Sequence, residues 1–240
     1  MDCVQRRGSL YLTQIKCFVI VGGHAVNRAR QGGRVMSAAH VRAIGCLLLG
    51  CLLAGGSQAA DVAALAAPCE DCHGKNGVSQ ADDVPTIAGI SAPVHGDFLL
   101  AYQEKARPCR ASRYRHGDTS RPETDMCAVA AKLSEADVAA LTEHFAAQAF
   151  VPAKQPFDAA KAAAGKALHA RDCAKCHANG GRNADDDASI LGGQHLKYLQ
   201  QALADFRSGK REPGKKMGEK LKPLTDADVE ALLQYYASLQ

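Results

Sequence analysis

The chain has 240 residues, of which 22% are charged and 47% hydrophobic, a composition typical of a soluble globular protein. This composition excludes a disordered or collagen-like chain. The formal net charge of +4 belongs to the N-terminal region, because residues 1–59 hold seven Lys and Arg against one Asp and leave 22 basic and 24 acidic side chains in residues 60–240. Net charge therefore gives no support for a nucleic-acid partner, and we expect none.

Residues 36–59 have the organisation of a secretory signal. A short basic start at Met36–Arg42 precedes an apolar run at Ile44–Ala54 and small residues that end at Ala59. The apolar run is too short to span a bilayer, so we expect a cleaved signal and a periplasmic protein. An acylated Cys51 is the alternative. Residues 1–35 form an upstream extension, and we expect translation to begin at Met36.

The pattern C-x-x-C-H occurs twice in residues 60–240, at Cys69, Cys72 and His73 and again at Cys173, Cys176 and His177. This pattern is typical of c-type haem attachment, in which two thiols add to the vinyl groups and the next residue presents its imidazole to the iron. On a helix this spacing directs all three side chains to one porphyrin edge. Zinc binding and a thioredoxin-like redox pair are the alternatives, but a second ligand pair at short spacing is missing. We predict two haem c groups.

Residues 60–240 contain only two methionines, Met126 and Met217, and each precedes the last predicted helix of its half by the same spacing. We predict that they bind the second axial position of the two irons, with His116 and His195 as the alternatives. An iron with two protein ligands has no open position for a substrate. The haems should therefore transfer electrons, and we assign no catalytic residue.

The first half is longer than the second, and much of the excess lies between Arg107 and Asp125. Two cysteines outside the C-x-x-C pairs, Cys109 and Cys127, flank this arginine-rich segment, and we predict a disulfide between them because an exported protein can keep such a pair oxidised. The segment is either a stapled loop at a haem edge that a partner recognises or a solvated insertion. Basic residues around Met217 favour an acidic redox partner: Lys210, Arg211, Lys215, Lys216, Lys220 and Lys222.

Each half ends in a predicted amphipathic helix, at 133–145 and at 224–236. Both begin with a capping pattern, Ser134-x-x-Asp137 and Thr225-x-x-Asp228. Two prolines in residues 149–156 indicate a stiff linker, and no long stretch alternates with period two. We predict an all-α protein of two tandem domains, at 60–148 and 157–240, packed through their haem-bearing sides.

These residues resemble two-domain class I cytochromes c of the cytochrome c4 type, and within them the dihaem subunit of flavocytochrome c sulfide dehydrogenase. The resemblance to that subunit is specific mainly over 150–240, in the stretches 151–158, 173–181 and 190–194 and in Tyr198, Asp205–Arg207 and Lys216–Met217. The arginine-rich segment with Cys109 and Cys127 departs from that pattern. Ser189 also stands where the first half has Pro85, whose carbonyl in such cytochromes orients the ligand imidazole.

The resemblance implies a partner chain, a flavoprotein with FAD that takes electrons from sulfide. The chain would then be the electron-transfer subunit of a sulfide:cytochrome c oxidoreductase rather than a catalyst on its own, and a soluble cytochrome or terminal oxidase would accept the electrons. A free cytochrome c4-like carrier to a terminal oxidase is the alternative. The flavin site would belong to a separate polypeptide, because G-x-G-x-x-G does not occur in this sequence.

Overall fold

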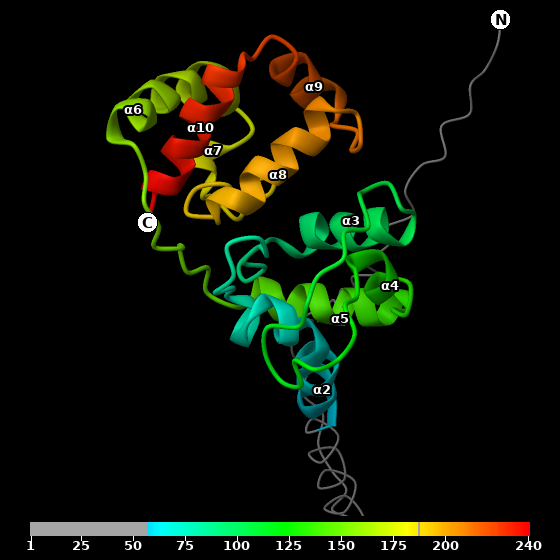
Figure 1. Ribbon diagram of the computed structural model, residues 1–240. Coiled ribbons are helices and arrows are strands. Elements are labelled where there is room, and N and C mark those ends of the chain that lie inside the picture. The colour runs from blue at the N-terminus through cyan, green and yellow to red at the C-terminus, as the bar shows by residue number, and fades with distance from the viewer. Residues whose placement is uncertain (1–56, 187) are drawn as a thin grey trace, which may run out of the picture. The chain divides into compact units, whose positions relative to one another are not determined.

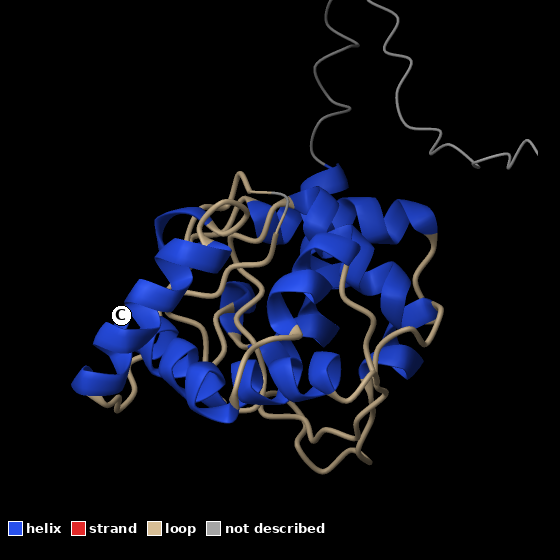
Figure 2. Cartoon of the chain, turned by 90° about the horizontal axis from the view of Figure 1, so that it is seen from above, coloured by secondary structure: helices blue, strands red, loops and turns tan. Residues whose placement is uncertain are grey.

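The computed structural model describes residues 57–186 and 188–240, and its regular elements over these ranges are helices (Figure 2). Extended pairing is limited there to one isolated bridge between Ser112 and Thr124. The predicted all-α fold class is confirmed. The predicted upstream extension and secretory signal, residues 1–59, lie outside the described residues except for 57–59, which begin the first helix in Figure 1.

The helices fall into two sets along the chain. The first half contains α2 (Ser57–His73), the short 3-10 helix η1 (Lys75–Gly77), α3 (Ala92–Gln103), α4 (Met126–Ala130) and α5 (Glu135–Ala146). The second half contains α6 (Ala159–Leu168), the π-helical turn η2 (His169–Cys173), α7 (Ala178–Gly181), α8 (Leu196–Arg207), α9 (Lys215–Leu221) and α10 (Asp226–Ser238). Within the described part of the chain, no helix is both long enough and apolar enough to cross a bilayer.

The halves repeat one set of backbone hydrogen bonds around the loop that follows each C-x-x-C-H segment. A glycine carbonyl accepts hydrogen bonds from two loop amides, at 2.8 and 3.2 Å in the first half and at 2.7 and 3.2 Å in the second. A second glycine then donates its amide to a backbone carbonyl of the last helix, at 2.9 Å in both halves. The residues are Gly77, Ile87, Ala88, Gly89 and Phe145 in the first half and Gly181, Leu191, Gly192, Gly193 and Tyr236 in the second. This register makes Pro85 and Ser189 equivalent positions.

The last helix of each half begins at a capping box. In α5 the Ser134 hydroxyl accepts from the amide of Asp137, whose carboxylate accepts from the Ser134 amide at 2.9 Å. Thr225 and Asp228 make the same reciprocal pair at the start of α10, also at 2.9 Å. Both predicted N-terminal caps are therefore present, and both helices bury their apolar faces in the core of their half.

Helices α6 and α10 lie side by side in the second half (Figure 1). Their close approach depends on Gly165, where an added Cβ would lie only 1.9 Å from the carbonyl oxygen of Ala231. In the first half, α5 packs on α2 and α3, and Leu141 and Phe145 of α5 are almost fully buried. Each half thus has a core formed around its own last helix.

Residues 149–156, the predicted linker, form no helix, and their amides and side chains bind the second half. The Ala153 amide donates to the Gly193 carbonyl at 2.8 Å, and the Gln155 side chain binds the backbone of Gln194 and Leu196, each at 2.8 Å. Gln194 is itself fully buried and makes two bonds to Thr86, from its amide nitrogen to the Thr86 carbonyl at 2.8 Å and from the Thr86 amide to its oxygen at 2.9 Å. This side chain therefore joins the two halves.

Candidate functional site

The first C-x-x-C-H segment forms the last turn of α2. Cys69 and Cys72 lie three positions apart on one face and His73 ends the helix, because Gly74 adopts a positive φ of 77° that a helix cannot continue. Neither cysteine is in a disulfide, and both are half-buried. Burial, with a smaller contribution from Glu70, raises the pKa of Cys69 to about 11. The predicted anchors are thus available as neutral thiols for covalent attachment.

His73 is buried and held in one tautomer. Its Nδ1–H donates to the Pro85 carbonyl at 2.8 Å, so the unprotonated nitrogen is Nε2. Burial lowers the pKa of His73, although the Pro85 carbonyl acts in the opposite direction. A neutral imidazole with a free Nε2 and an oriented Nδ1–H is the form that binds a metal. The orienting role that the resemblance implies for Pro85 is present in this half.

A cavity of about 390 Å³ opens beside this turn. Cys69, Cys72 and His73 of α2 form one wall, and Met126 at the start of α4 also lines it, together with apolar side chains such as Phe145. The structure therefore brings the predicted anchors and both predicted ligands of the first haem to one space. Two thiols, an imidazole and a thioether around an apolar cavity are a donor set that fits haem c.

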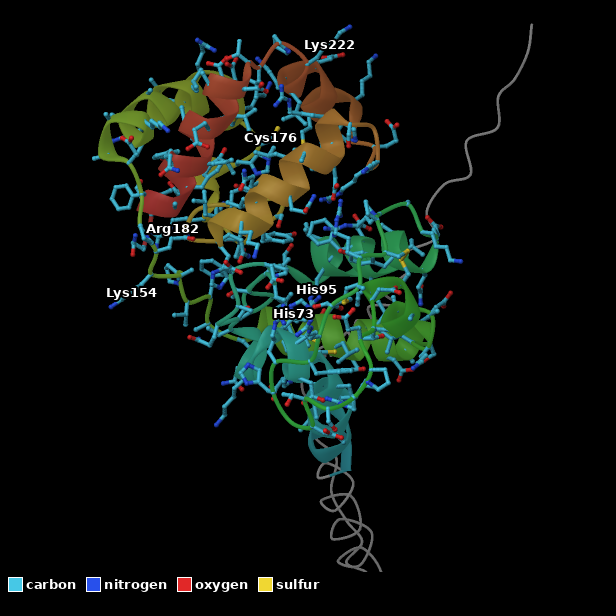
Figure 3. All side chains as sticks on the ribbon, in the orientation of Figure 1. His73, His95, Lys154, Cys176, Arg182 and Lys222 are labelled. Carbon is cyan, nitrogen blue, oxygen red and sulfur yellow. A yellow bond between two sulfur atoms is a disulfide. The ribbon has the colours of Figure 1, made fainter. Side chains whose placement is uncertain are left out.

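A second histidine, His95 of α3, lines the same cavity next to His73 (Figure 3). It is buried, its Nδ1 has no hydrogen-bond partner, and its ring packs on Phe145 with centroids 5.9 Å apart. Burial, and then His73, lowers the pKa of His95 to about 4, so the ring is neutral. No sequence motif assigns a role to His95. The repeat register is the signal that could have found it, because His95 corresponds to the core residue Leu199.

The segment between Arg107 and Asp125 closes one side of this cavity. Cys109 and Cys127 are disulfide-bonded, which confirms the predicted staple. Asp71 lies inside the C-x-x-C-H segment, and its backbone carbonyl accepts hydrogen bonds from the amides of Arg115 and His116 at 2.8 and 2.9 Å. Its carboxylate pairs with the Arg121 guanidinium at 2.6 Å. Tyr114 and Arg121 of the segment line the cavity. The insertion is therefore a wall of the first site. The alternative ligand His116 is exposed on it, outside the cavity lining.

The second C-x-x-C-H segment has a different local geometry. Cys173 ends the π-helical turn η2 and is half-buried, Cys176 is exposed, and His177 precedes α7 (Figure 3). The buried Nδ1 of His177 has no hydrogen-bond partner among the described residues. Burial, and then His169, lowers the pKa of His177, whereas Asp186 and the backbone of Ser189 act in the opposite direction. Ser189, which replaces Pro85, therefore does not hold His177 as Pro85 holds His73.

The two remaining candidate ligands lie in different surroundings. Met217 is half-buried in α9 among exposed lysines, and one of these, Lys220, pairs with Asp172 at 3.2 Å. The alternative ligand His195 is buried elsewhere, where its Nε2–H donates to the Ser79 carbonyl at 3.0 Å in the other half. One predicted member of the basic surface, Arg211, instead stacks on Phe206, with its guanidinium carbon 4.2 Å from the ring centroid.

The known proteins that are similar to this chain include cytochromes c. The cytochrome c family model matches residues 162–240. A cytochrome c4 of Pseudomonas aeruginosa is 30% identical over 202 residues, which cover 80% of this chain and 93% of that protein. A thiosulfate dehydrogenase electron acceptor of Stutzerimonas stutzeri is 29% identical over 181 residues, covering 71% and 78% of the two chains.

A solved structure, reduced recombinant cytochrome c4 from Pseudomonas stutzeri, matches with a TM-score of 0.60 at 27% identity and covers 78% of this chain and all of that one. The predicted fold of two tandem class I cytochrome c domains and the predicted cofactors, two haem c groups, are thereby confirmed. The names of these relatives include thiosulfate dehydrogenase but not sulfide dehydrogenase. The finer resemblance to the sulfide dehydrogenase subunit stays a prediction, as do the domain boundaries and the residues assigned to each iron.

Proposed function

This chain belongs to the cytochrome c4 family, and on that premise we propose that it is an exported carrier of the electrons released when a reduced sulfur compound is oxidised. Haem c, when bound, supplies a one-electron iron couple. The chain supplies the covalent anchors, the axial ligands, a site shielded from water and the surface that meets redox partners.

The observation that carries this proposal is that His73 and Met126, from two different helices, line one apolar cavity. If these two side chains held the iron, it would have no open position for a substrate, which favours electron transfer over oxygen or peroxide chemistry. The assigned anchors are Cys69, Cys72, Cys173 and Cys176, and the assigned iron ligands are His73, Met126, His177 and Met217.

The proposed donor and the proposed location rest on three further observations. A relative named as a thiosulfate dehydrogenase electron acceptor matches 71% of the chain, so a dehydrogenase that oxidises a sulfur compound is the proposed donor. The signal-like segment at 36–59 and the oxidised Cys109–Cys127 pair both support a periplasmic location. A soluble cytochrome or a terminal oxidase is the proposed acceptor.

A second candidate function is a permanent haem subunit of a flavocytochrome c sulfide dehydrogenase. The sequence similarity over 150–240 favours it, in particular the connector 151–158, which binds along the second half through Ala153 and Gln155. In this case the partner is a flavoprotein that holds FAD and remains bound during purification. The two candidates share the same electron-transfer chemistry and differ in donor and in permanence of assembly.

The experiment that separates them is purification of the untagged protein from native periplasm, followed by a haem-stained denaturing gel and visible spectra. A single haem-staining chain that is reduced when thiosulfate and periplasmic extract are added supports the free carrier. A co-purifying flavin chain together with reduction by sulfide supports the subunit. If dithionite reduces the haems but neither sulfur compound does, with or without extract, the proposed donor class is wrong.

The axial assignments have their own test with carbon monoxide, which binds ferrous haem only at an open position. We expect no binding to the wild-type protein and one molecule per chain in Met126→Ala and in Met217→Ala. His116→Ala and His195→Ala, the alternative ligands, serve as matched controls and should bind none. Carbon monoxide binding to the wild-type protein, or to a histidine variant alone, would contradict the assignment.

A further inference from the structure

His95 lies on the face of α3 that borders the first cavity. Four residues of this helix line the cavity at the spacing of one helical face: His95, Phe98, Leu99 and Tyr102. His95 is the first of them and lies in the first turn of the helix, where its amide donates to the Ser91 carbonyl at 2.9 Å. Its side chain therefore belongs to the wall of the cavity, beside His73 (Figure 3).

Packing alone does not explain a histidine at this position. In the second half the equivalent position holds Leu199, an apolar core residue. His95 is 6% exposed, and its Nδ1 has no hydrogen-bond partner among the described residues. Burial of an unpaired ring nitrogen is unfavourable, and a leucine fills such a space without that cost. An unpaired nitrogen in the wall of a cavity therefore indicates that the imidazole binds a group inside the cavity.

The helix that carries His95 packs against the helix that carries the assigned thioether ligand. Helix α3 packs on α4, which begins at Met126. At the end of α3 the side-chain amide of Gln103 donates to the carbonyls of Ala130 and Leu133, each at 3.0 Å. His95 and Met126 thus reach one cavity from two helices that are fixed to each other, whereas His73 reaches it from α2.

We propose that His95 is a competing ligand of the first haem iron and takes the axial position of Met126 when the thioether leaves ferric iron. In this exchange the bond from the Met126 sulfur to iron breaks, a bond from an unprotonated ring nitrogen of His95 to iron forms, and neither an electron nor a proton moves. The ring is available because burial lowers the pKa of His95 and keeps the imidazole neutral. Imidazole is a common haem ligand, and relative to a thioether it favours ferric iron.

The consequence of the exchange is that the first iron stays closed. His73 and His95 together fill both axial positions, so loss of the thioether opens no position on ferric iron for peroxide or another small ligand. The exchange is confined to ferric iron, so ferrous Met126→Ala still binds carbon monoxide. The inference rests on the proposed ligand set of the first haem and is independent of which enzyme supplies the electrons.

The test is made on oxidised Met126→Ala holoprotein by electron paramagnetic resonance and visible spectroscopy. We expect both haems of this variant to be low-spin, because His95 fills the position that Met126 has left. In Met126→Ala combined with His95→Leu, one haem per chain should become high-spin, and azide should bind about tenfold more tightly because the position is then free. Leucine is the residue of the equivalent core position in the second half, so it suits the packing.

His144→Leu in the same Met126→Ala background is the matched control. The His144 ring also packs on Phe145, with centroids 5.0 Å apart, but this residue is absent from the cavity lining. This double variant should stay low-spin at both haems. If Met126→Ala yields no holoprotein, Met126→Leu, which keeps most of the side-chain volume, carries the test with the same partner substitutions.

Three results would overturn the exchange. In the first, Met126→Ala alone already contains one high-spin haem per chain, so the thioether assignment stands and only the role of His95 is wrong. In the second, His95→Leu and His144→Leu give the same spin state in the Met126→Ala background. In the third, ferric Met126→Ala has the same spectrum as the wild type, which refutes the thioether assignment itself and the exchange with it.

Discussion

Breaking the Cys109–Cys127 disulfide should lower the free energy of unfolding by about 3 kcal/mol. The crosslink joins residues separated by 18 positions, and the loop-closure entropy that it removes from the unfolded chain corresponds to about 3 kcal/mol for a loop of that length. Cys109 is exposed and Cys127 is buried, so Cys109→Ser breaks the bond without opening a cavity. Adding Cys127→Ala removes a buried sulfur and should cost about 1 kcal/mol more.

The assay is urea unfolding of the holoprotein followed by far-ultraviolet circular dichroism, with the dependence on urea compared between variants. Wild-type protein treated with a thiol reductant should match Cys109→Ser. Arg113→Gln, in the same loop, should stay within about 0.5 kcal/mol of the wild type. If Cys109→Ser unfolds at the same urea concentration as Arg113→Gln, the staple contributes no loop-closure stabilisation and the reasoning is refuted.

Cys109→Ser should also change the properties of the first haem and leave the second haem unaffected. Cys127 follows Met126, the assigned ligand, and Cys109 lies two residues after Arg107. Without the crosslink we expect weaker thioether ligation and a lower potential at the first haem, with the second haem unchanged. The ferric spectrum and a redox titration measure both quantities, and an equal change at the two haems would contradict a local role of the loop.

Three further predictions concern helix packing, a buried hydrogen bond and a helix cap. Gly165→Ala places a Cβ against the backbone of α10 and should cost about 2–3 kcal/mol in a urea titration, whereas Gly96→Ala, in an open part of α3, should cost nothing. Gln194→Ala leaves the buried amide and carbonyl of Thr86 without partners, so a loss of about 3 kcal/mol is expected, and a neutral result would show that water replaces it. The capping box holds the pKa of Asp228 below its usual value. The carboxylate therefore stabilises the fold above about pH 4, and this contribution is lost as pH falls through the folded pKa, so Asp228→Asn should show a shallower acid limb in pH-dependent unfolding.

Structural features that are set by residues close together in the sequence could be predicted from the sequence. The two C-x-x-C-H turns, the capping boxes and the duplicated order of helices are set by spacings of a few residues, and a helix converts such spacings directly into shared faces. The disulfide was also predictable, because only one pair of cysteines remains in residues 60–240 once the C-x-x-C motifs are set aside. These local signals were sufficient for the fold class and for the cofactors.

Contacts between distant segments were decided only by the tertiary structure. Thr86 and Gln194 are 108 positions apart, and no pattern in the sequence predicts that one side chain would satisfy both backbone groups of the other. Arg211 belongs to a basic stretch that looks solvated, yet packing of α8 brings it to Phe98. The burial of His95 likewise depends on which face of α3 meets α5. Side-chain periodicity shows that a face is buried but does not identify the opposing surface, and that surface determines which side chains meet at the first cavity.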